Sequence, residues 1–520
     1  MDKSTNRAPN LPTRSLLVVA FAFLTALGIW PALTNGQPFF YADTTAYVRG
    51  ADLAISRVLG DRYATEWAKD QRRSFQLQAP APISAPSVVE HTVKRRVVLA
   101  GRSIIYGALL CLGEHFGRMW LSVLTQSLAA TYLLFLFVGR TLSLDFRYFL
   151  VCCAALFVLS PLPFFVSFLM PDVFAAFLIL GFAILATSWD RLNNFERTMT
   201  SAILLFAVLV HTTHLILLLG LSVLALGYVS LFAKTLLVNI RSLMAIAAAC
   251  VAIAFLWEFA FSFAVSKALG SAAVRPPFVT AKLVSMLGKP AVSTICQSNS
   301  FVVCRFQDRL PIDTEAFLWS EDENAGVFGV ADPETKRLLS AEQWQFAMSI
   351  IPLNFGHFVA GISQDALRQL TQISLREYSY HPAGLAFFRD RLPRHEFDIL
   401  NSSVAARSGV YVVYGYTVLN VAAVLGAIVT VLFMAGIPRF QGDTGQLERG
   451  KTWRAAACIL LSGVFLNAII CGGFSAVNNR YQARVIWLIQ LCALSGVCVM
   501  VPHRNVDLAW KRRIERHSTS

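Results

Sequence analysis

Long apolar runs are the feature that most constrains this chain. Stretches of about twenty apolar residues, the length at which an α-helix crosses about 30 Å of hydrocarbon, recur along the sequence. A transmembrane barrel would instead show alternating polar and apolar residues. Only 15% of the 520 residues are charged and the mean hydropathy is +0.56, whereas a soluble chain carries about 25% charge. We therefore predict an all-α polytopic membrane protein and exclude a soluble enzyme.

The apolar runs define about ten candidate transmembrane spans. They are 14–33, 118–139, 148–168, 172–189, 199–211, 214–233, 242–266, 410–435, 455–475 and 483–501. The run 199–211 is short and continues into the next through His211-Thr212-Thr213-His214, so the two are either tightly connected spans or one broken helix. Trp30-Pro31 follows the first run without a small-residue cleavage site, and we interpret that run as a retained helix instead of a signal peptide.

The positions of lysine and arginine predict the orientation of the bundle. With the N-terminus inside, the cytoplasmic segments hold eighteen Lys and Arg residues, against one, Arg480, in the three short outer turns near 170, 212 and 478. The positive-inside rule then places both termini in the cytoplasm, and we expect a bacterial inner (plasma) membrane protein. The loops 34–117 and 267–409 lie outside. The net charge of +14 is therefore mainly a topology signal, and we expect no nucleic-acid partner.

This topology predicts four segments. They are an N-terminal membrane module at 1–266 with about seven spans, an extracytoplasmic soluble domain at 267–409, a C-terminal membrane module at 410–501 with three spans, and a basic cytoplasmic tail at 502–520. The extracytoplasmic domain is balanced, with fourteen Lys and Arg against fourteen Asp and Glu. Its two cysteines are Cys296 and Cys304, and an oxidising compartment makes them a candidate disulfide. No GxGxxG, Walker or HExxH motif supports cytosolic nucleotide or zinc chemistry.

Polar side chains gather at the outer ends of the expected spans. Asp43 follows the first span in Tyr41-Ala42-Asp43-Thr44-Thr45-Ala46-Tyr47, and Asp172 follows Met170-Pro171 at the start of the fourth. The other members of this group are Arg102, Tyr106, His211, His214, Arg480 and Arg484. Helix capping explains the two acids, and snorkelling or an aromatic belt explains several of the others. Their convergence on one face of the membrane favours a functional site, because ionisable groups are costly at this depth.

At these residues the sequence resembles the GT-C superfamily of integral-membrane glycosyltransferases, which use polyprenyl-phosphate-linked sugars. The resemblance covers roughly residues 14–235. The family's essential acidic residue in the first outer loop matches Asp43, and its acidic residue at the start of a later span matches Asp172. Its juxtamembrane helix resembles the stretch that begins Arg102-Ser103-Ile104-Ile105-Tyr106, although the prolines of the family's RPP motif are absent. Its Lys/His-bearing turn resembles His211-Thr212-Thr213-His214.

The resemblance implies a GT-C-like fold and a membrane glycosyltransferase. Such an enzyme moves a sugar from a polyprenyl-phosphate donor to a lipid, glycan or protein acceptor on the extracytoplasmic face. Asp43 is then the first candidate for the catalytic base and Asp172 the second. The residues that bind the donor phosphate or other parts of the substrates are expected to be Arg102, Tyr106, His211, His214, Arg480 and Arg484. A divalent cation bound by Asp43 and Asp172 is an alternative, and membrane lipids are further expected partners.

Two other classes of protein fit part of the pattern. A polysaccharide polymerase or ligase would place essential Arg and His residues in the large outer loop, here in Arg389-Asp390-Arg391-Leu392-Pro393-Arg394-His395, which a charged surface also explains. A lipid or glycan transporter or flippase would show inverted repeats and ionisable residues near the bilayer midplane. No clear repeat occurs, and Glu258 is the only acidic residue well inside a span. A transferase requires Asp43, Asp172, His211 and Arg480 to lie together at the outer face.

Overall fold

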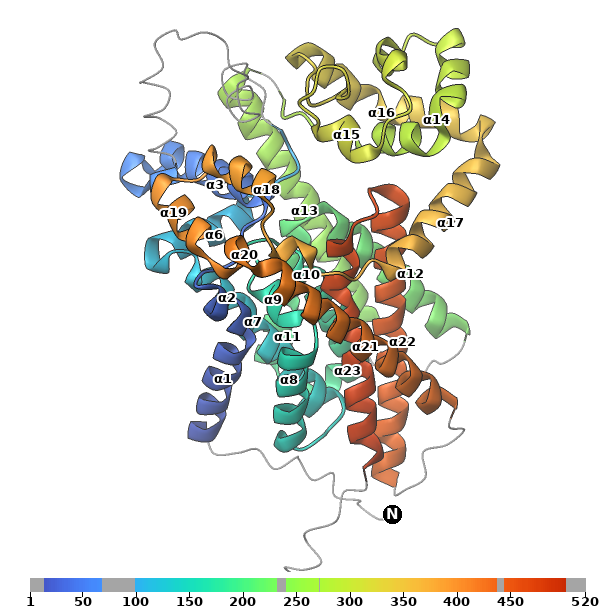
Figure 1. The fold of residues 1–520 in the computed structure, drawn as a ribbon. Helices are drawn as coiled ribbons and strands as arrows, with labels where there is room; N and C mark the ends of the chain where they lie inside the picture. The colour runs from blue at the N-terminus through green and yellow to red at the C-terminus, as the bar shows by residue number, and fades with distance from the viewer. Residues whose placement is uncertain (1–13, 68–98, 232–239, 271, 437–443, 502–520) are drawn as a thin grey trace, which may run out of the picture.

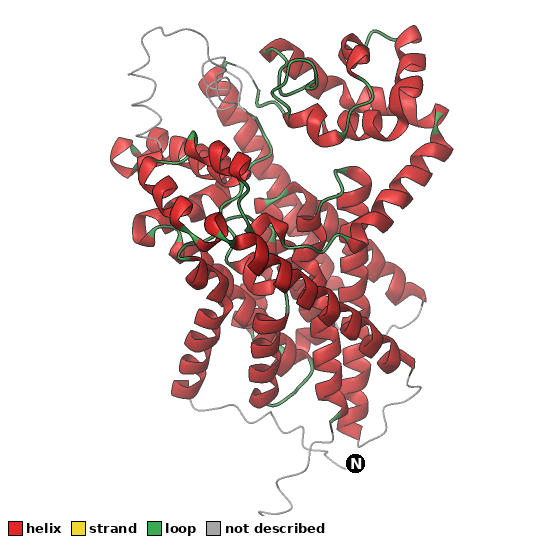
Figure 2. Cartoon of the chain, viewed as in Figure 1, coloured by secondary structure: helices red, strands yellow, loops and turns green. Residues whose placement is uncertain are grey.

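The computed structural model of the protein describes residues 14–67, 99–231, 240–270, 272–436 and 444–501. Within these ranges the chain is helical and contains no strand, only two isolated bridges, Phe39 with Phe168 and Leu99 with Val274 (Figure 2). The expected basic tail at 502–520 and part of the first outer loop, 68–98, lie outside the described residues. The chain is thus an all-α membrane protein, as the apolar runs predict.

The helices fall into three groups along the chain (Figure 1). The first group is α1 (Arg14–Gly28), α2 (Trp30–Asn35), α3 (Ala42–Leu59), η1 (Asp61–Tyr63), α6 (Ile104–Gly117), α7 (Trp120–Phe135), η2 (Leu136–Thr141), α8 (Phe146–Leu159), α9 (Leu162–Val166), α10 (Val173–Ser188), η3 (Trp189–Arg191), α11 (Asn194–Val210), α12 (Thr212–Leu231) and α13 (Ile240–Leu269). The second group is α14 (Phe278–Ser298), η4 (Val302–Arg309), α15 (Thr314–Trp319), α16 (Pro333–Leu353), α17 (Phe355–Thr371), η5 (Arg376–Tyr378), α18 (Pro382–Arg389), α19 (Arg394–Ser402) and α20 (Val404–Arg407). The third group is α21 (Gly409–Gly436), α22 (Thr444–Ala468), η6 (Ile469–Gly473) and α23 (Asn479–Met500).

Six helical stretches in the described ranges are long and apolar enough to cross a membrane. They are Trp120–Thr141, Val173–Arg191, Ile240–Lys267, Val412–Gly436, Gly445–Gly473 and Asn479–Met500. A seventh is counted if α16 and α17, which meet at a 106° bend, form one broken span. Each of the six corresponds to one of the ten expected spans. The other four expected spans, 14–33, 148–168, 199–211 and 214–233, fall on shorter or interrupted helices.

Prolines explain two of these interruptions. The run 14–33 divides into α1 and α2 just before Pro31, and the run 148–168 divides into α8 and α9 just before Pro161. Proline lacks a backbone donor and restricts the residue before it, so a helix tends to end there and a new one to begin. The stretch 199–211 belongs to α11, which starts earlier, at Asn194, and ends where His211 takes an extended backbone conformation before α12. The sequence therefore contains two helices here, joined at the histidine turn.

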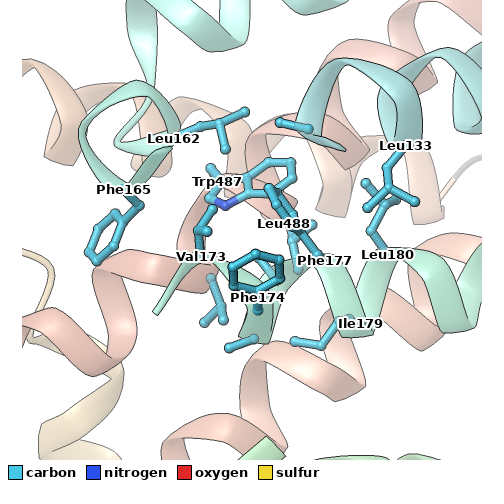
Figure 3. Close-up of a cluster of buried hydrophobic side chains, with 14 of the residues drawn as sticks. Leu133, Leu162, Phe165, Val173, Phe174, Phe177, Ile179, Leu180, Trp487 and Leu488 are labelled. Carbon is cyan, nitrogen blue, oxygen red and sulfur yellow. The ribbon is translucent and has the colours of Figure 1, made fainter. Parts of the chain in front are cut away.

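Helix α10 lies at the centre of the bundle. All sixteen of its residues are buried, which is expected for a helix that is apolar on every side. Phe174, Phe177 and Leu180 pack in a cluster with Trp487 and Leu488 of α23 (Figure 3). Because α10 is fixed by neighbours all round, its first turn, just after Asp172, is a rigid place to hold a functional side chain.

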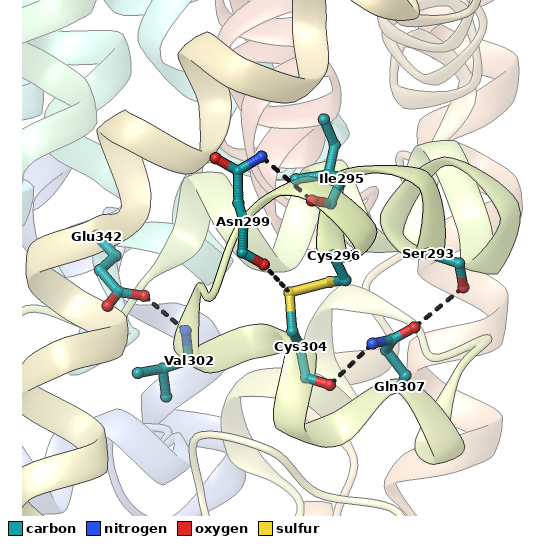
Figure 4. Close-up of a disulfide and its surroundings, with 8 residues drawn as sticks. All are labelled: Ser293, Ile295, Cys296, Asn299, Val302, Cys304, Gln307 and Glu342. Atoms are coloured by element: carbon teal, nitrogen blue, oxygen red, sulfur yellow. Dashed lines mark hydrogen bonds between the residues drawn. A yellow bond between two sulfur atoms is a disulfide. The ribbon is translucent and has the colours of Figure 1, made fainter.

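The expected extracytoplasmic segment 267–409 contributes to two separate hydrophobic cores. Buried residues between Val274 and Ile350 form a core of their own, and we call the residues 274–350 the outer domain. Cys296 and Cys304 form a disulfide within it (Figure 4). By contrast, Leu375, Tyr378 and other residues up to position 405 belong to the main core of the membrane module. The second part of the segment is therefore packed against the membrane helices.

Helices α3 and α6 pack closely beside the membrane bundle. A Cβ atom at Gly107 would lie 2.2 Å from the backbone oxygen of Tyr47, so only glycine permits this approach. At the other end of α6, burial and, to a smaller extent, the nearby Glu396 carboxylate of α19 together raise the pKa of the Glu114 carboxyl to about 7. The protonation of Glu114 in α6 therefore depends on Glu396, which brings a second carboxyl group near α6 from α19.

Candidate functional site

Asp43 and Arg102 form an ion pair between the first turn of α3 and the residues just before α6. Asp43 lies in the first turn of α3, and its Oδ1 is 2.6 Å from Nη2 of Arg102. About a quarter of each side chain is exposed, 23% for Asp43 and 25% for Arg102. Burial lowers the pKa of Arg102, but the Asp43 carboxylate outweighs it and raises that pKa above its ordinary value. Asp43 is not the N-cap of α3, which is Tyr41, so its carboxylate serves the arginine.

Local hydrogen bonds fix both partners of this pair. Thr44 Oγ1 donates to the backbone oxygen of Leu169, and Leu169 N donates to Phe39 O at 2.9 Å, which ties the Asp43 loop to the turn before α10. Ser103 caps α6, and its Oγ donates to Leu209 O at 2.9 Å. Ser103 therefore holds the residue before it, Arg102, beside the end of α11.

Asp172 pairs with two arginines of α23. Its Oδ1 lies 3.3 Å from Nη1 of Arg484 and 3.6 Å from Nε of Arg480. All three side chains are buried, with exposed fractions of 3%, 1% and 7% in the order Asp172, Arg484, Arg480. Asp172 occupies the N-cap position of α10 but makes no capping hydrogen bond. The helix-capping interpretation of this residue is therefore replaced by a buried ion cluster.

The two arginines are held very differently. Arg484 Nη2 donates to Asn467 Oδ1 at 3.0 Å and contacts Cys471 Sγ at 3.2 Å, both on the neighbouring chain segment of α22 and η6. Besides its 3.6 Å ion pair with Asp172, the Arg480 guanidinium makes one hydrogen bond to the described residues, a long one from Nη2 to the Tyr481 hydroxyl, at 3.4 Å. Arg484 is thus built into the fold, whereas the Arg480 guanidinium has few fixed partners.

Three N–H groups of these arginines lack a hydrogen-bond acceptor. They are Nε and Nη1 of Arg480 and Nε of Arg484, and all are buried. A buried donor without a partner costs about 1 to 3 kcal/mol, and more when it is charged. Both guanidinium groups pair with the same atom, Oδ1 of Asp172. The unpaired N–H groups are therefore suited to hydrogen bonding with a bound anion.

Tyr41 joins the ion cluster to the Asp43–Arg102 pair. The Arg480 guanidinium lies 4.3 Å from the centroid of the Tyr41 ring, and Tyr41 is two residues before Asp43. The turn before Arg480 is held from another direction, because Gln369 of α17 accepts from Asn478 N at 2.9 Å and donates to Asn478 O at 2.7 Å. The first outer loop, the start of α10 and the start of α23 therefore meet at one place.

The histidines lie next to this cluster. The rings of His211 and His214 are 5.1 Å apart, and Arg484, Arg102 and Arg480 are within electrostatic range of His211. The Nδ1 of His214 lies 2.7 Å from Ala207 O, which can only accept, so Nδ1 donates. In its neutral form His214 then has a bare Nε2, and this atom is buried without a partner. A bare Nε2 accepts a proton or hydrogen bond and does not donate to phosphate.

Tyr106 serves mainly the packing of the bundle. It is fully buried, its hydroxyl donates to Gln126 Oε1 of α7 at 3.0 Å, and its ring packs edge-on against Tyr47 at 5.3 Å. Its hydroxyl hydrogen is therefore already used. This placement gives Tyr106 the role of supporting α3 and α6 behind Asp43 and Arg102.

The charged run at 389–395 is only partly tied to the first outer loop. Arg391 stacks on the Phe387 ring at 3.7 Å, and its backbone oxygen accepts from Arg49. Arg389 and Asp390 pair with each other on the surface, with exposed fractions of 65% and 62%. The arginines of this run thus anchor α18 or face the solvent.

The carboxylates do not form a shared cation site. Across the described ranges, no group of three or more His, Cys, Asp or Glu side chains is arranged to hold a metal ion. Asp43 is paired with Arg102, and Asp172 is paired with Arg480 and Arg484. Guanidinium groups therefore occupy one oxygen, Oδ1, of each of these two carboxylates.

Sequence reasoning missed several residues that support or face the site. Asn467 is a lone amide in the apolar run 455–475, and such a polar residue at membrane depth was a usable signal. Gln369 and Trp319 gave no such signal, because both lie in the long outer segment, where polar and aromatic residues are ordinary.

Comparison of the chain with protein-family models, with curated proteins and with solved structures found no match.

Proposed function

We propose that this protein is a membrane glycosyltransferase of the GT-C type, which transfers a sugar from a polyprenyl-phosphate donor to an acceptor at the outer face of a bacterial inner membrane. The proposal includes the topology predicted from the sequence, with about ten membrane crossings and both termini in the cytoplasm.

One observation carries this proposal. Within the described residues, the buried arginines Arg480 and Arg484 present three N–H groups without acceptors, in a cluster where both pair with the single atom Oδ1 of Asp172. Arginine binds phosphate oxygens through charge-assisted hydrogen bonds, often two at a time. The cluster lies at the outer end of the apolar helices α10 and α23, where the phosphate of a membrane-bound lipid would be found. A lipid-linked phosphate therefore supplies the hydrogen-bond acceptors that these N–H groups lack.

The second requirement of the reaction is a base, and Asp43 supports it. In the transfer, the oxygen of an acceptor hydroxyl forms a bond to the anomeric carbon of the sugar, and the bond from that carbon to the phosphate oxygen breaks. The electron pair leaves with the polyprenyl phosphate, and the hydroxyl proton passes to the Asp43 carboxylate. The arginines stabilise the negative charge that develops on the leaving phosphate.

The Asp43–Arg102 pair gives this scheme an order of events. Asp43 accepts a hydrogen bond from Arg102 at 2.6 Å, so the guanidinium occupies its Oδ1. A phosphate bound beside Arg102 competes for the guanidinium and frees the carboxylate. The donor phosphate thus activates the base, so that Asp43 acts only when the donor is in place.

The test is transfer from labelled donors by the purified protein in lipid nanodiscs. Polyprenyl-phosphate donors, each carrying one radiolabelled hexose or pentose, are incubated with lipid-linked oligosaccharides, free oligosaccharides, a polyprenol and a peptide. We expect wild type to move label from one donor to an acceptor. Asp43→Asn lowers the rate at least about 100-fold, within the 10²–10⁴ range typical of general bases. The matched control is Asp390→Asn, an exposed acid of the outer face, and it retains wild-type transfer.

Two results of this transfer assay would contradict the proposal. If wild type transfers no sugar from any donor, the protein is not this kind of transferase. If Asp43→Asn transfers as fast as Asp390→Asn, Asp43 is not the base, and the same experiment with Asp172→Asn tests the second candidate. Equal melting temperatures of the variants separate a loss of chemistry from a loss of folding.

A further inference from the structure

The short helix α15 presents two side chains outward from the outer domain. Asp313 caps this helix by accepting from the backbone N–H groups of Glu315 and Ala316, each at 2.9 Å. Phe317 and Leu318 are buried in the core of the outer domain. Glu315 and Trp319, four residues apart, share another face of the helix, and both are exposed, Trp319 by 36%. Trp319 also packs edge-on against Phe278 at the border of the outer-domain core, with 6.1 Å between ring centroids, and leaves part of its surface exposed.

Both side chains reach the candidate site of the membrane module. The guanidinium of Arg102 lies 5.5 Å from the centroid of a Trp319 ring, while the same guanidinium binds Asp43. The charged side chains within electrostatic range of Glu315 include Arg480, Asp43 and Arg102. Figure 1 shows α15 at the edge of the outer domain that faces the membrane helices. The outer domain thus adds an aromatic ring and a carboxylate to the site.

The connection between the two parts keeps α15 in this position. Ala100, two residues before Arg102, donates its N–H to Val274 O at 2.8 Å, at the start of the outer domain. At the far end, the Lys282 ammonium of α14 binds Asp365 of α17 and the backbone oxygen of Gly472, both at 2.8 Å. The outer domain is therefore fixed to the first outer loop and to η6 on opposite sides.

We propose that Glu315 and Trp319 bind the acceptor of the transfer reaction, and that this acceptor is a glycan. The inference rests on the proposed function. A pyranose ring has a flat face of C–H groups that packs on the electron-rich face of an indole, and its hydroxyl groups donate to a carboxylate. The phosphate of the donor needs neither group and is already served by the arginines, and the donor KM distinguishes binding of the donor's own sugar from binding of the acceptor. The two residues lie on the outer-domain side of Asp43, so a sugar hydroxyl held there faces the proposed base.

The experiment uses the full chain in nanodiscs and separates the KM for the acceptor from that for the donor. The variants are Trp319→Leu, Trp319→Phe and Glu315→Gln. The controls lie in the same outer domain but away from the site: Trp344→Leu, whose side chain is 66% exposed on α16, and Glu323→Gln, also exposed. The acceptors are lipid-linked and free oligosaccharides, with a polyprenol and a peptide as acceptors that lack sugar.

We expect Trp319→Leu and Glu315→Gln each to raise the KM for the oligosaccharide acceptor about 10-fold or more, and to change the donor KM by less than twofold. Trp319→Phe recovers most of the loss, because it keeps an aromatic face. Saturation-transfer NMR on the wild-type protein shows contact with the sugar protons of the oligosaccharide, and this contact weakens in Trp319→Leu.

Three results overturn the inference. An acceptor KM unchanged relative to the two controls excludes recognition by α15, while transfer by wild type leaves the proposed function intact. A rise in the donor KM alone reassigns Trp319 to the positioning of Arg102. Preferred transfer to the polyprenol or the peptide excludes a glycan acceptor. If wild type transfers nothing, the proposed function fails, and this inference fails with it.

Discussion

Arg480→Gln tests the anion-binding cluster most directly, because this arginine has few bonds to lose. Its Nε and Nη1 are buried without acceptors, and its hydrogen bond to the Tyr481 hydroxyl is long, at 3.4 Å. In Arg480→Gln, Asp172 keeps Arg484 as a partner, at 3.3 Å. We therefore expect a small change in the free energy of unfolding, about 1 kcal/mol or less, since the side chain forms no strong hydrogen bond in the fold.

The expected effect on ligand binding is much larger. Each charge-assisted hydrogen bond contributes about 1.5 to 3 kcal/mol. The loss of two such bonds to a phosphate, partly offset by the remaining arginine, costs about 2 to 4 kcal/mol, which raises Kd about 30- to 1,000-fold. The assay measures binding of polyprenyl phosphate to the protein in nanodiscs, with the uncharged polyprenol as the ligand control. Arg275→Gln is the control variant, because Arg275 pairs with Glu258 away from the cluster and is 56% exposed.

Two results would refute this reasoning. Binding of polyprenyl phosphate by Arg480→Gln within threefold of wild type would show that the unpaired N–H groups do not serve the phosphate. A melting temperature lowered as far as that of Arg484→Gln would show that Arg480 is a structural residue. Arg484→Gln is expected to be the more destabilising change, because it also loses the bond to Asn467.

Three further predictions concern the framework around the site. Glu114→Gln stabilises the protein at pH 8 by up to about 3 kcal/mol, from about 1.4 kcal/mol per pH unit over the rise of the pKa from 4.5 to about 7. The sign follows because a carboxyl group with a raised folded-state pKa stabilises the fold below its unfolded-state pKa and loses that contribution as pH rises through about 7. Melting temperatures of wild type and variant at pH 4 and pH 8 measure this loss. An equal pH dependence of the two melting temperatures would contradict the prediction. Replacing Cys296 and Cys304 by serine lowers the stability of the outer domain by about 2 to 3 kcal/mol, the value for a short closed loop, and hydrogen exchange confined to residues 274–350 should report it. Gly107→Val separates α3 from α6, because its Cβ atom meets the Tyr47 backbone oxygen. We expect a lower melting temperature and reduced transfer in the same variant. Gly117→Val is the control, because the space around Gly117 is open.

Much of the site was predictable from the sequence because short turns leave little freedom. Asp172 had to lie at the membrane surface next to the first outer loop, since only a few residues separate its helix from the one before. The structure brings the turn before Asp172 next to that loop, with Phe39 N donating to Ser167 O at 3.0 Å. The four polar positions required to lie together for a transferase, Asp43, Asp172, His211 and Arg480, are neighbours in the structure. The spacing did not reveal which arginine pairs with which aspartate, because the side-chain rotamers and the packing around them determine these pairs.

The breaks in two apolar runs and the packing of the long outer segment were not predictable from the hydropathy pattern. Apolar composition alone did not show that the runs 14–33 and 148–168 are interrupted, since Pro31 and Pro161 divide them while leaving the hydropathy high. The segment 267–409 was expected as one soluble domain from its balanced charge. Its second part instead packs in the main core through residues such as Tyr378 and Tyr380, and the Tyr380 hydroxyl accepts from Phe40 N at 2.8 Å. Hydropathy does not distinguish a covered loop from a free domain.

The sequence by itself determined that this chain is an all-helical membrane protein and that its polar residues gather at one end of the apolar helices. Those properties follow from the cost of placing charge and unpaired backbone in hydrocarbon, which acts on each segment separately. Only the tertiary structure decided that Asp172 is shared by two arginines, that Arg480 keeps unpaired N–H groups, and that Trp319 meets Arg102. These contacts join segments more than a hundred residues apart, and the packing of α10, α23 and the outer domain is what brings them together.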